Sequence, residues 1–417
     1  MTASDDNTDR AQTFGSPEYN ACPYAFYDTA RTAAPAYEIP DVGAFLVTRY
    51  DAVLAAAKTP EAFSSHRPKF GAGDPELEAI MAEGYPSVAA LVTADPPEHT
   101  RYRKLVTKPF TARAVTRHEA LIRSTVTELI DSFIDTGEFE LLTDFAVQLP
   151  IRVIGPIMGV PSADQPNFGR WADVIAESVS GYLPRERSLE CARELVAMQR
   201  YFAALVEERR ASPGDDLISE LLTAEEDAER PLDMPEILEL IRIFLAGGTE
   251  STASLLGSAF YLLLTHPEQF AQVRADHTLI PAMLEETLRL ESPVQWNPRM
   301  VENPDVSLDG VAVPVGSRVL LSWGAANRDP AQFGPDADEF NIHRPRAPHV
   351  AFGHAFHFCL GAPLARLEAK IACEQLLSRL GDIELAVPAE ELTFVGHGVV
   401  RRVASLPLRF RLPDATR

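Results

Sequence analysis

Cysteine is scarce in this chain: only four of its 417 residues are cysteines, at Cys22, Cys191, Cys359 and Cys373. So few cysteines in so long a chain cannot form the dense disulfide framework of small secreted domains. The start, Met1 to Gly15, is polar and acidic and lacks the positive and apolar stretches of a signal peptide, so we expect none. These absences favour a reducing compartment, and we expect a cytoplasmic protein.

Long apolar runs and positive charge are also in short supply. No run of about 18 apolar residues is available to cross a bilayer, so we expect no membrane span. Lysine and arginine number 38 against 60 aspartate and glutamate residues, which gives a formal net charge of −22. A chain this acidic is repelled by nucleic acids and by anionic membranes, and we expect neither as a main partner.

Linkers, repeats and low-complexity tracts are absent as well. Nothing rich in proline, glycine and serine divides the chain, so residues 1–417 are expected to form one large domain. This length is enough to bury a sizeable core and still enclose a ligand. The longest helical pattern, from Met234 to Thr265, is apolar on nearly all sides, as expected of a helix through the middle of a protein. We predict a mainly α fold with a small β portion.

Local signals predict particular elements around this helix. Residues 37–49 alternate around a turn at Asp41 to Gly43, which predicts a hairpin. The stretch from Val311 to Gly316 predicts a second hairpin, and residues 63–94 are expected to be rich in loops. Asp95 is expected to cap the helix that follows it.

Cys359 lies between a turn that contains Gly353 and a helical pattern that starts after Gly361. A thiolate at such a place faces unpaired backbone N–H groups and the positive end of the helix dipole, which lower its pKa. An anionic sulfur of this kind suits the axial ligand of a haem iron. The glycines let the backbone approach a flat cofactor, and Phe352 offers a ring to pack on it. The alternative is that Cys359 is a small buried apolar residue, as most free cysteines are.

The segment from Phe352 to Gly361 resembles the haem-binding loop of the cytochrome P-450 superfamily, Phe-Gly-x-Gly-x-His-x-Cys-x-Gly. It departs from the family pattern at one position, where Ala355 replaces the second glycine. The resemblance implies haem b as the cofactor and Cys359 as the ligand of its iron. It also implies the cytochrome P-450 fold, in which the haem lies between the long central helix and the cysteine loop.

Cationic side chains are placed to bind the carboxylates of such a cofactor. His99 and Arg103 are four residues apart, so they share one helical face and can converge on one anion. In the family these two positions contact the haem propionates, and the resemblance implies the same role for Arg299 and His357. The alternative for His99 and Arg103 is a solvated polar face.

The segment from His99 to His118 contains no acid, which reverses the sign of the chain locally. Its basic residues are Arg101, Arg103, Lys104, Lys108, Arg113 and Arg117, and Arg366 and Lys370 are expected to extend them. A positive surface near the cysteine would attract an acidic electron donor, for which we expect a ferredoxin. A solvated helix without a partner is the alternative.

Two adjacent glycines, Gly247 and Gly248, lie inside the long central helix and cost it roughly 2 kcal/mol relative to alanine. The family pattern Ala/Gly-Gly-x-acid-Thr supplies a reason, because there the helix opens above the iron to admit dioxygen and an ordered water. The resemblance makes Glu250 the acid that relays protons and Ser251 the alcohol that directs them. Packing alone is the alternative for the glycines. The other candidates for the alcohol are Thr249 and Thr252.

Glu286 and Arg289 lie three residues apart in a helical pattern from Ile280 to Leu290 and can meet on one face. They resemble the Glu-x-x-Arg pair of the family, which a later arginine joins behind the cysteine loop. Arg344 matches that third position by its distance from Cys359. We therefore expect a buried ion pair of these three residues.

The substrate pocket is the least specific part of the prediction. The family lines it at positions that correspond here to Ile243, Ala246, Val294, Gln295, Trp296 and the region from His397 to Val399. Apolar residues at such positions, Trp296 among them, equally fit the plain core.

The function implied by the resemblance is a monooxygenase. Such an enzyme inserts one atom of O2 into a small, mostly apolar molecule by hydroxylation or oxidative dealkylation. Its electrons come from NAD(P)H through a ferredoxin reductase and a ferredoxin. The alternatives are a haem-thiolate enzyme driven by peroxide and a haem sensor or carrier without enzymatic activity.

Overall fold

The computed structural model describes residues 13–39, 42–67, 69–180, 183–224, 230–303, 306–396 and 399–412. Its α-helices are α1 (Pro17–Ala21), α2 (Tyr24–Ala33), α3 (Tyr50–Ala57), α4 (Pro75–Met81), α5 (Glu98–Val106), α6 (Ala112–Val115), α7 (Glu119–Asp131), α8 (Gln148–Ile157), α9 (Gln165–Ser180), α10 (Arg185–Ala211), α11 (Leu217–Ala224), α12 (Met234–Thr265), α13 (Pro267–Ala275), α14 (Ile280–Glu291), α15 (Trp323–Ala326), α16 (Pro330–Phe333) and α17 (Ala362–Arg379). A π-helical turn, η4 (Leu141–Ala146), precedes α8.

The strands are β1 (Ala36–Ile39), β2 (Ala44–Val47), β3 (Phe63–Ser64), β4 (Glu138–Glu140), β5 (Trp296–Val301), β6 (Ser307–Leu308), β7 (Val311–Ala312), β8 (Arg318–Ser322), β9 (Glu384–Leu385), β10 (Phe394–Gly396), β11 (Arg401–Val403) and β12 (Pro407–Arg409). The largest sheet has the order β1-β2-β8-β5-β3. In this sheet β2 and β8 are parallel, and the other neighbouring strands are antiparallel. The protein is therefore mainly α with a small β portion, as the sequence predicts.

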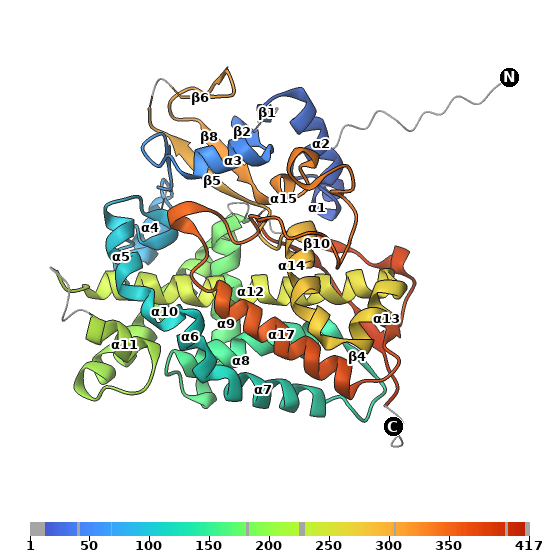
Figure 1. The fold of residues 1–417 in the computed structure, drawn as a ribbon. Helices are drawn as coiled ribbons and strands as arrows, with labels where there is room; N and C mark the ends of the chain where they lie inside the picture. Colours follow the sequence, from blue (N-terminus) through green and yellow to red (C-terminus); the bar gives the residue numbers. More distant parts are fainter. Residues whose placement is uncertain are drawn as a thin grey trace.

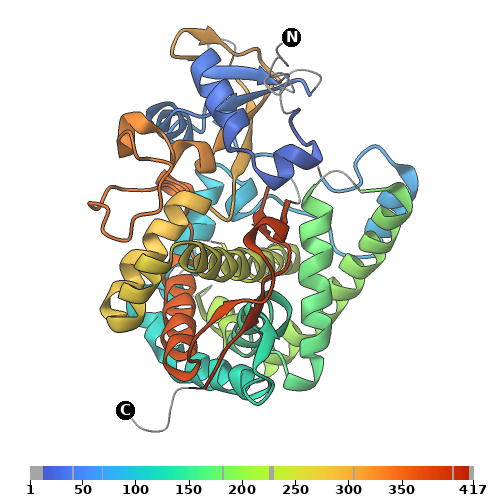
Figure 2. The same cartoon turned by 90° about the vertical axis from the view of Figure 1, so that its right-hand side faces the viewer.

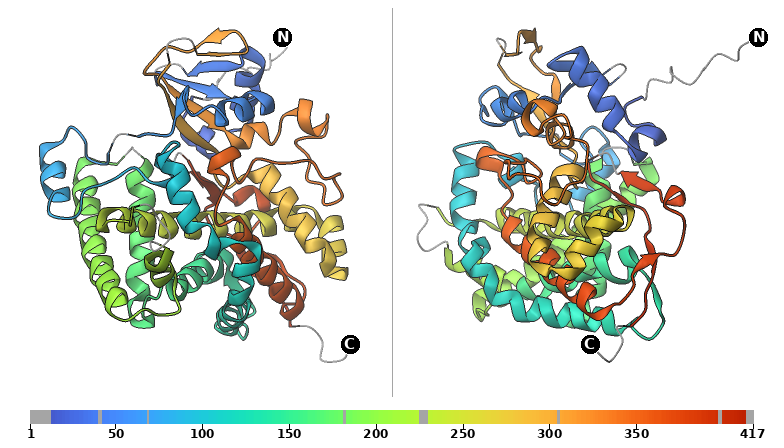
Figure 3. Two further views of the ribbon diagram at one scale, coloured as in Figure 1. Left: turned by 60° about the vertical axis from the view of Figure 1, so that its left-hand side comes forward. Right: turned by 45° about the vertical axis from the view of Figure 1, so that its right-hand side comes forward.

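The five-stranded sheet and the helices α1 to α3 form one layer, which lies above a larger helical body in Figure 1. Helix α12 crosses the middle of that body and is viewed nearly along its axis in Figure 2. It packs against α8, α9, α14, α17 and β11, so the other helices are arranged around it. Figure 3 shows α17 and the chain before it between α12 and the outer helix α7.

Helix α12 spans the range predicted from its apolar pattern, Met234 to Thr265. Its start is a capping box, in which the side chains of Asp233 and Glu236 each accept a hydrogen bond from the other's backbone N–H. The helix is continuous through Gly247, so the local opening expected there is not present in this structure. Within the intact helix, the Ser251 hydroxyl donates a hydrogen bond to the Gly247 carbonyl four residues earlier.

The predictions for the hairpins had mixed outcomes. The hairpin of β1 and β2 is confirmed. The second hairpin was misplaced: its strands are β6 and β7, and its turn is Asp309–Gly310, with φ of 46° and 85°. Asp-Gly is a strong two-residue turn signal because both positions accept positive φ. The stretch predicted as a hairpin instead contains β7 and the turn at Gly316 that leads into β8.

The expected cap of α5 was wrong. The residue before this helix is Pro97, and no side chain caps the helix start. The carboxylate of Asp95 instead accepts hydrogen bonds from the Ser64 hydroxyl at 2.6 Å and the Ser65 backbone N–H at 3.0 Å. Asp95 therefore ties β3 to the start of α5, a contact between segments that local sequence does not reveal.

Gln295 and Trp296 belong to the core, which corrects their assignment to the substrate pocket. The Trp296 ring is 9% exposed and packs among the aromatic side chains of the N-terminal helices. The Gln295 amide donates to the backbone oxygens of Glu291 and Ser292, and its oxygen accepts a hydrogen bond from Tyr27. In an alternating strand, neighbouring residues point to opposite faces, so sequence spacing alone does not show which face lines a pocket.

None of the helices that the structure describes is long and apolar enough to cross a membrane.

Candidate active site

The cysteine loop is a tight turn held by its own backbone. The N–H of Cys359 donates to the Phe352 oxygen at 2.8 Å, and the N–H of Phe358 donates to the Ala355 oxygen at 3.0 Å. Gly353 has a φ of 72° and Ala355 a φ of 55°, so both lie in the left-handed region. Glycine adopts this region freely, whereas alanine does so with strain. The one departure from the motif therefore falls on a strained backbone position.

The Cys359 thiol lies just before α17, where the N–H groups of Gly361 and Ala362 face it. Burial raises its pKa, and this effect outweighs the lowering by those N–H groups and by the nearby guanidinium groups of Arg103 and Arg366. The N–H groups at the helix start lower the pKa of Cys359, as predicted. The net shift is nevertheless upward, because burial has the larger effect. A metal ion bound to the sulfur would stabilise the thiolate at this position.

Glu285, a residue that the sequence did not single out, supports the loop from behind. Its carboxylate accepts two hydrogen bonds from Arg366, at 2.7 and 2.8 Å, and one from His349 at 3.0 Å. The Arg366 guanidinium in turn lies over the Phe352 ring, 4.4 Å from its centroid. Burial raises the pKa of Glu285, but the lowering by Arg366 and His349 is larger, and the pKa is about 2. The carboxylate therefore stays charged and keeps the Arg366 guanidinium over the Phe352 ring.

Five basic side chains, of which the three arginines carry the positive charge, converge beside the loop, and we call them the cation cluster: Arg67, His99, Arg103, Arg299 and His357. None of them forms an ion pair with a carboxylate of the described residues. His99 is 2% exposed, and its Nδ1 has no hydrogen-bond partner there. The rings of His99 and His357 are 4.5 Å apart. Sequence patterns predicted four of the five residues and missed Arg67.

Burial lowers the pKa of each member of the cation cluster, and the charge of other members lowers it further for His99, Arg299 and His357. Burial, followed by Arg299 and His99, lowers the pKa of His357 to about 2. Burial and Arg67 lower the pKa of Arg299 to about 10. His357 shares a hydrogen bond of 2.8 Å with the Ser65 hydroxyl, and Arg103 donates to the Phe358 oxygen at 2.7 Å. Buried cations that lack a carboxylate are stabilised when an anion binds among them.

These residues fit an iron porphyrin. A buried thiol suits the iron, and the cation cluster suits two carboxylates. A Cβ added to Gly247 or to Gly361 would meet no neighbouring atom within 4 Å. There is therefore open space beside α12 at Gly247 and beside the start of α17 at Gly361. The unpartnered Nδ1 of His99 offers a further polar atom to a propionate. The donor set and the space thus match the cofactor that the sequence predicts.

Helix α12 carries the residues predicted for proton delivery. The Ser251 hydroxyl donates to the Gly247 oxygen at 3.0 Å, one turn earlier, and the side chains of Ser251 and Glu250 are partly buried. The hydroxyl of Thr249 is buried and donates to Leu245, and Thr252 is 3% exposed. Ser251 is therefore the alcohol whose side chain shares a helical turn with the glycine pair and remains accessible.

Glu286, Arg289 and Arg344 are brought together as their spacing suggests. The Glu286 carboxylate accepts two hydrogen bonds from Arg289, both at 2.8 Å, and one from Arg344 at 3.0 Å. The arginines also donate to backbone oxygens of the segment between β8 and the cysteine loop: those of Asn327, Phe333, Asp336, Ala337 and Glu339. These three residues thus fasten the chain that leads to the loop, and their hydrogen bonds among the described residues do not reach the loop itself.

The remaining pocket positions are placed as follows. Ile243 and Ala246 are partly buried on α12 and pack against the main core. Val294 is partly buried, and its backbone forms a bridge with Val400. His397 and Gly398 lie outside the described residues.

The positive surface near the cysteine is smaller than the sequence suggested. Arg101 pairs with Glu236 at 2.9 Å, Arg117 with Glu220 at 2.5 Å, and Lys370 with Glu374 at 3.6 Å. Arg366 is bound to Glu285. Among the described residues, Lys104, Lys108 and Arg113 have no ion-pair partner, and all three are exposed. They lie on α5, on α6 and between them, close to the start of α17 (Figure 1).

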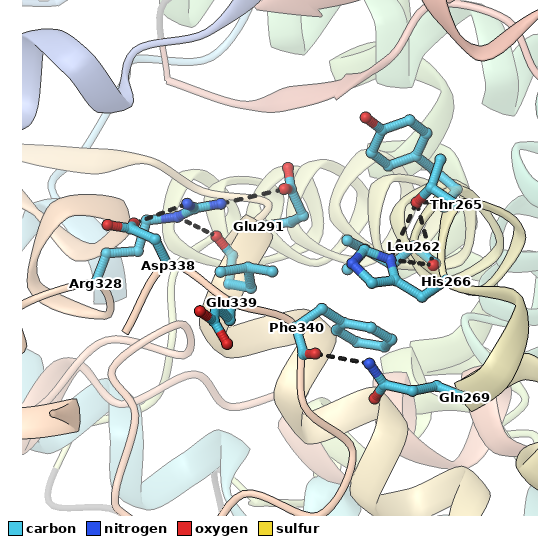
Figure 4. Close-up of a pocket in the computed structure, with 11 residues that line it drawn as sticks. Leu262, Thr265, His266, Gln269, Glu291, Arg328, Asp338, Glu339 and Phe340 are labelled. Atoms are coloured by element: carbon cyan, nitrogen blue, oxygen red, sulfur yellow. Dashed lines mark hydrogen bonds and ion pairs between the residues drawn. The ribbon is translucent and has the colours of Figure 1, made fainter. Parts of the chain in front are cut away.

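A separate cleft of about 630 Å³ opens between the end of α12 and the segment at Phe340 (Figure 4). Within the cleft, the Arg328 guanidinium donates hydrogen bonds to the carboxylates of Glu291 and Asp338. The His266 ring bonds the Leu262 oxygen at 2.8 Å. This cleft shares no residue with the cysteine loop.

Comparisons with known proteins show which chains this one is similar to. The family model described as Cytochrome P450 matches residues 165–381. The chain is 36% identical over 394 residues to the 6-deoxyerythronolide B hydroxylase of Saccharopolyspora erythraea, covering 93% of this chain and 95% of that one. It is 36% identical to the cytochrome P450 monooxygenase PikC of Streptomyces venezuelae, covering 94% and 92%. The structure of cytochrome P450 CYP109Q5 from Chondromyces apiculatus superposes with a TM-score of 0.84 at 37% identity, covering 96% and 98%.

Replacing Ala355 by glycine is expected to stabilise the protein. The left-handed backbone costs alanine about 1 kcal/mol or more, and the larger chain entropy of unfolded glycine offsets part of that gain. We expect a net gain of about 0.5 kcal/mol, measured as the free energy of unfolding in urea. Ala351→Gly, in the same loop at a position without positive φ, is the control and is expected to destabilise. A loss of stability in Ala355→Gly would contradict the strain.

Replacing Glu286 by alanine is expected to remove about 3–5 kcal/mol of stability, because two buried arginines lose their carboxylate. The purified variant is expected to contain little haem, measured as the ratio of Soret absorbance to protein. Glu268→Ala, an exposed position on α13, is the control. Recovery of Glu286→Ala with a full complement of haem would rule out this supporting role.

Proposed function

The chain belongs to the cytochrome P450 family and is a monooxygenase that uses haem b, and we propose that it oxidises a small, mostly apolar organic molecule by hydroxylation or oxidative dealkylation. We propose that electrons come from NAD(P)H through a ferredoxin reductase and a ferredoxin. The observation that carries the proposal is a partly buried thiol before α17, together with an acid and an alcohol, Glu250 and Ser251, on the central helix α12. Four free cysteines and a strongly acidic chain support a cytoplasmic location.

In the proposed site the protein holds the cofactor at three places. Cys359 would bind the iron through its sulfur, and the cation cluster would bind the propionates. Phe352, held by Arg366 and Glu285, would limit movement of the cysteine loop. When bound, haem supplies the transfer of electrons to dioxygen and the splitting of its O–O bond.

Residues of α12 would supply protons to the reaction. Glu250 carries the carboxyl that exchanges protons with its surroundings, and Ser251 carries the hydroxyl that passes them on. The bond from Ser251 to the Gly247 oxygen fixes the direction of the hydroxyl proton in the resting protein. A serine has no methyl group on Cβ, so its χ1 rotamer is less restricted than that of a threonine.

The electron donor would bind where Lys104, Lys108 and Arg113 surround the exposed side of the cysteine loop. Phe358, next to Cys359, is 41% exposed and adds an apolar contact. Arg103 links α5 to this loop through the Phe358 oxygen. An acidic ferredoxin would be attracted by the unpaired cations and would then lie close to the sulfur ligand.

Ser251→Thr is expected to release less hydrogen peroxide per NAD(P)H consumed than the wild type, because threonine restricts the hydroxyl to fewer rotamers. Peroxide and product are measured together with the same substrate and ferredoxin. Thr249→Ser, which changes the neighbouring buried hydroxyl, is the control and is expected to leave the ratio unchanged. A change in Thr249→Ser with none in Ser251→Thr would assign the alcohol to Thr249.

The function is tested by supplying the holoprotein with NAD(P)H, reductase, ferredoxin and 18O2. Candidate substrates are apolar molecules that shift the Soret band on binding. We expect one 18O atom per product molecule. Product formed from hydrogen peroxide at the same rate without ferredoxin would instead favour a peroxide-driven enzyme.

Lys104→Glu with Lys108→Glu is expected to slow ferredoxin-supported turnover about tenfold at low salt, and less at high salt, because opposite charges then repel the donor. Arg193→Glu, an exposed position on α10, is the control. Unchanged dependence on ferredoxin concentration in the double variant would place the donor elsewhere.

A further inference from the structure

Arg67 is a cation that no sequence motif assigns. Its side chain is partly buried, and its Nε is fully buried without a hydrogen-bond partner among the described residues. Burial and the charge of Arg242 lower its pKa to about 10. A buried N–H donor of a guanidinium is normally bonded, so a free one marks a position that a ligand completes.

The chain around Arg67 is anchored firmly. Asp95 binds both Ser64 and Ser65, and the Ser65 hydroxyl bonds His357. Strand β3 pairs Ser64 with Met300 of β5, so the next position in this register sets Ser65 opposite Arg299. Arg67 follows two residues after Ser65. In an extended chain, side chains two residues apart point to the same side, so Arg67 lies on the side of Ser65. The guanidinium is therefore held near Arg299 and His357, and its charge lowers the pKa of both.

On its other side Arg67 approaches the first half of α12. Arg242 lies there, one turn before Ala246. Its guanidinium is bound by Glu239 at 2.5 and 2.9 Å, so this carboxylate is already engaged and does not neutralise Arg67. Arg67 thus lies between the other members of the cation cluster and Arg242 of α12, with no carboxylate of the described residues paired to it.

We propose that Arg67 is a carboxylate-binding residue of this enzyme, and that its ligand is a haem propionate or a carboxylate of the substrate. The inference rests on the proposed function, because both ligands belong to that site. A guanidinium presents parallel N–H groups that match a carboxylate in a bidentate pair. Arg67 would add such a donor to the four cations that the family pattern supplies.

The first measurement tests the propionate. Arg67→Gln removes the charge, Arg67→Lys keeps it without the fork, and Arg318→Gln makes the same change at an exposed position of the same sheet. The rate of haem transfer from each ferric holoprotein to apomyoglobin is compared. If the propionate is the ligand, Arg67→Gln loses haem about tenfold faster than wild type, as expected for a lost hydrogen bond to a charged group. Reconstitution with haem dimethyl ester is then expected to abolish the difference.

The second measurement tests the substrate. Dodecanoic acid and methyl dodecanoate are titrated into each holoprotein, and the Soret shift gives a Kd. If a substrate carboxylate is the ligand, Arg67→Gln weakens binding of the acid about tenfold and leaves binding of the ester unchanged. Arg67→Lys is expected to lie between the two, and Arg318→Gln to behave as wild type.

A change in either measurement supports the inference and identifies the ligand. If neither measurement separates Arg67→Gln from wild type, the inference is wrong, even where the wild type turns over with ferredoxin as proposed. If Arg67→Gln is purified without haem, its apoprotein is titrated with haemin and with haemin dimethyl ester. Weaker binding of haemin alone supports the inference, and equal weakening of both indicates a folding role and overturns it.

Discussion

Unpaired arginine charge beside a partly buried thiol is the constraint that shapes this structure. Arg299 and His99 are almost fully buried, and with Arg67, Arg103 and His357 they surround one region without forming an ion pair with a described carboxylate. Burying a charge without a partner costs several kcal/mol. In the proposed site, haem would supply two carboxylates for the arginines and a metal for the sulfur, which would offset this cost. Folding and cofactor binding are therefore coupled at this site.

The cation cluster is assembled by contacts between segments far apart in the chain. Asp95 joins β3 to α5, and Ser65 joins β3 to the cysteine loop through His357. Glu286 fixes the segment that leads to this loop, and Glu285 fixes the loop's own phenylalanine through Arg366. Each of these carboxylates serves a positioning role outside the cluster, which leaves the cations inside it free to bind an anion.

The sequence predicted those parts of the site whose residues are close together in a motif. The cysteine loop, the extent of α12 and the meeting of Glu286 with Arg289 follow from short spacings, and the structure shows all three. Arg67 and Glu285 were missed because their partners are distant in the chain, where spacing gives no signal. Trp296 was misassigned because an apolar residue fits a pocket and a core equally well. Arg101 was counted as surface charge, but a carboxylate 135 positions away binds it.

The continuous α12 changes how the glycine pair is understood. Two glycines lower the local helix stability by roughly 2 kcal/mol, and a serine that bonds back to the carbonyl four residues earlier weakens the turn further. Yet the helix is continuous, because α8, α9, α14, α17 and β11 pack against its other faces and stabilise it. The weak turn is therefore a place where a bound ligand can open the helix at low cost.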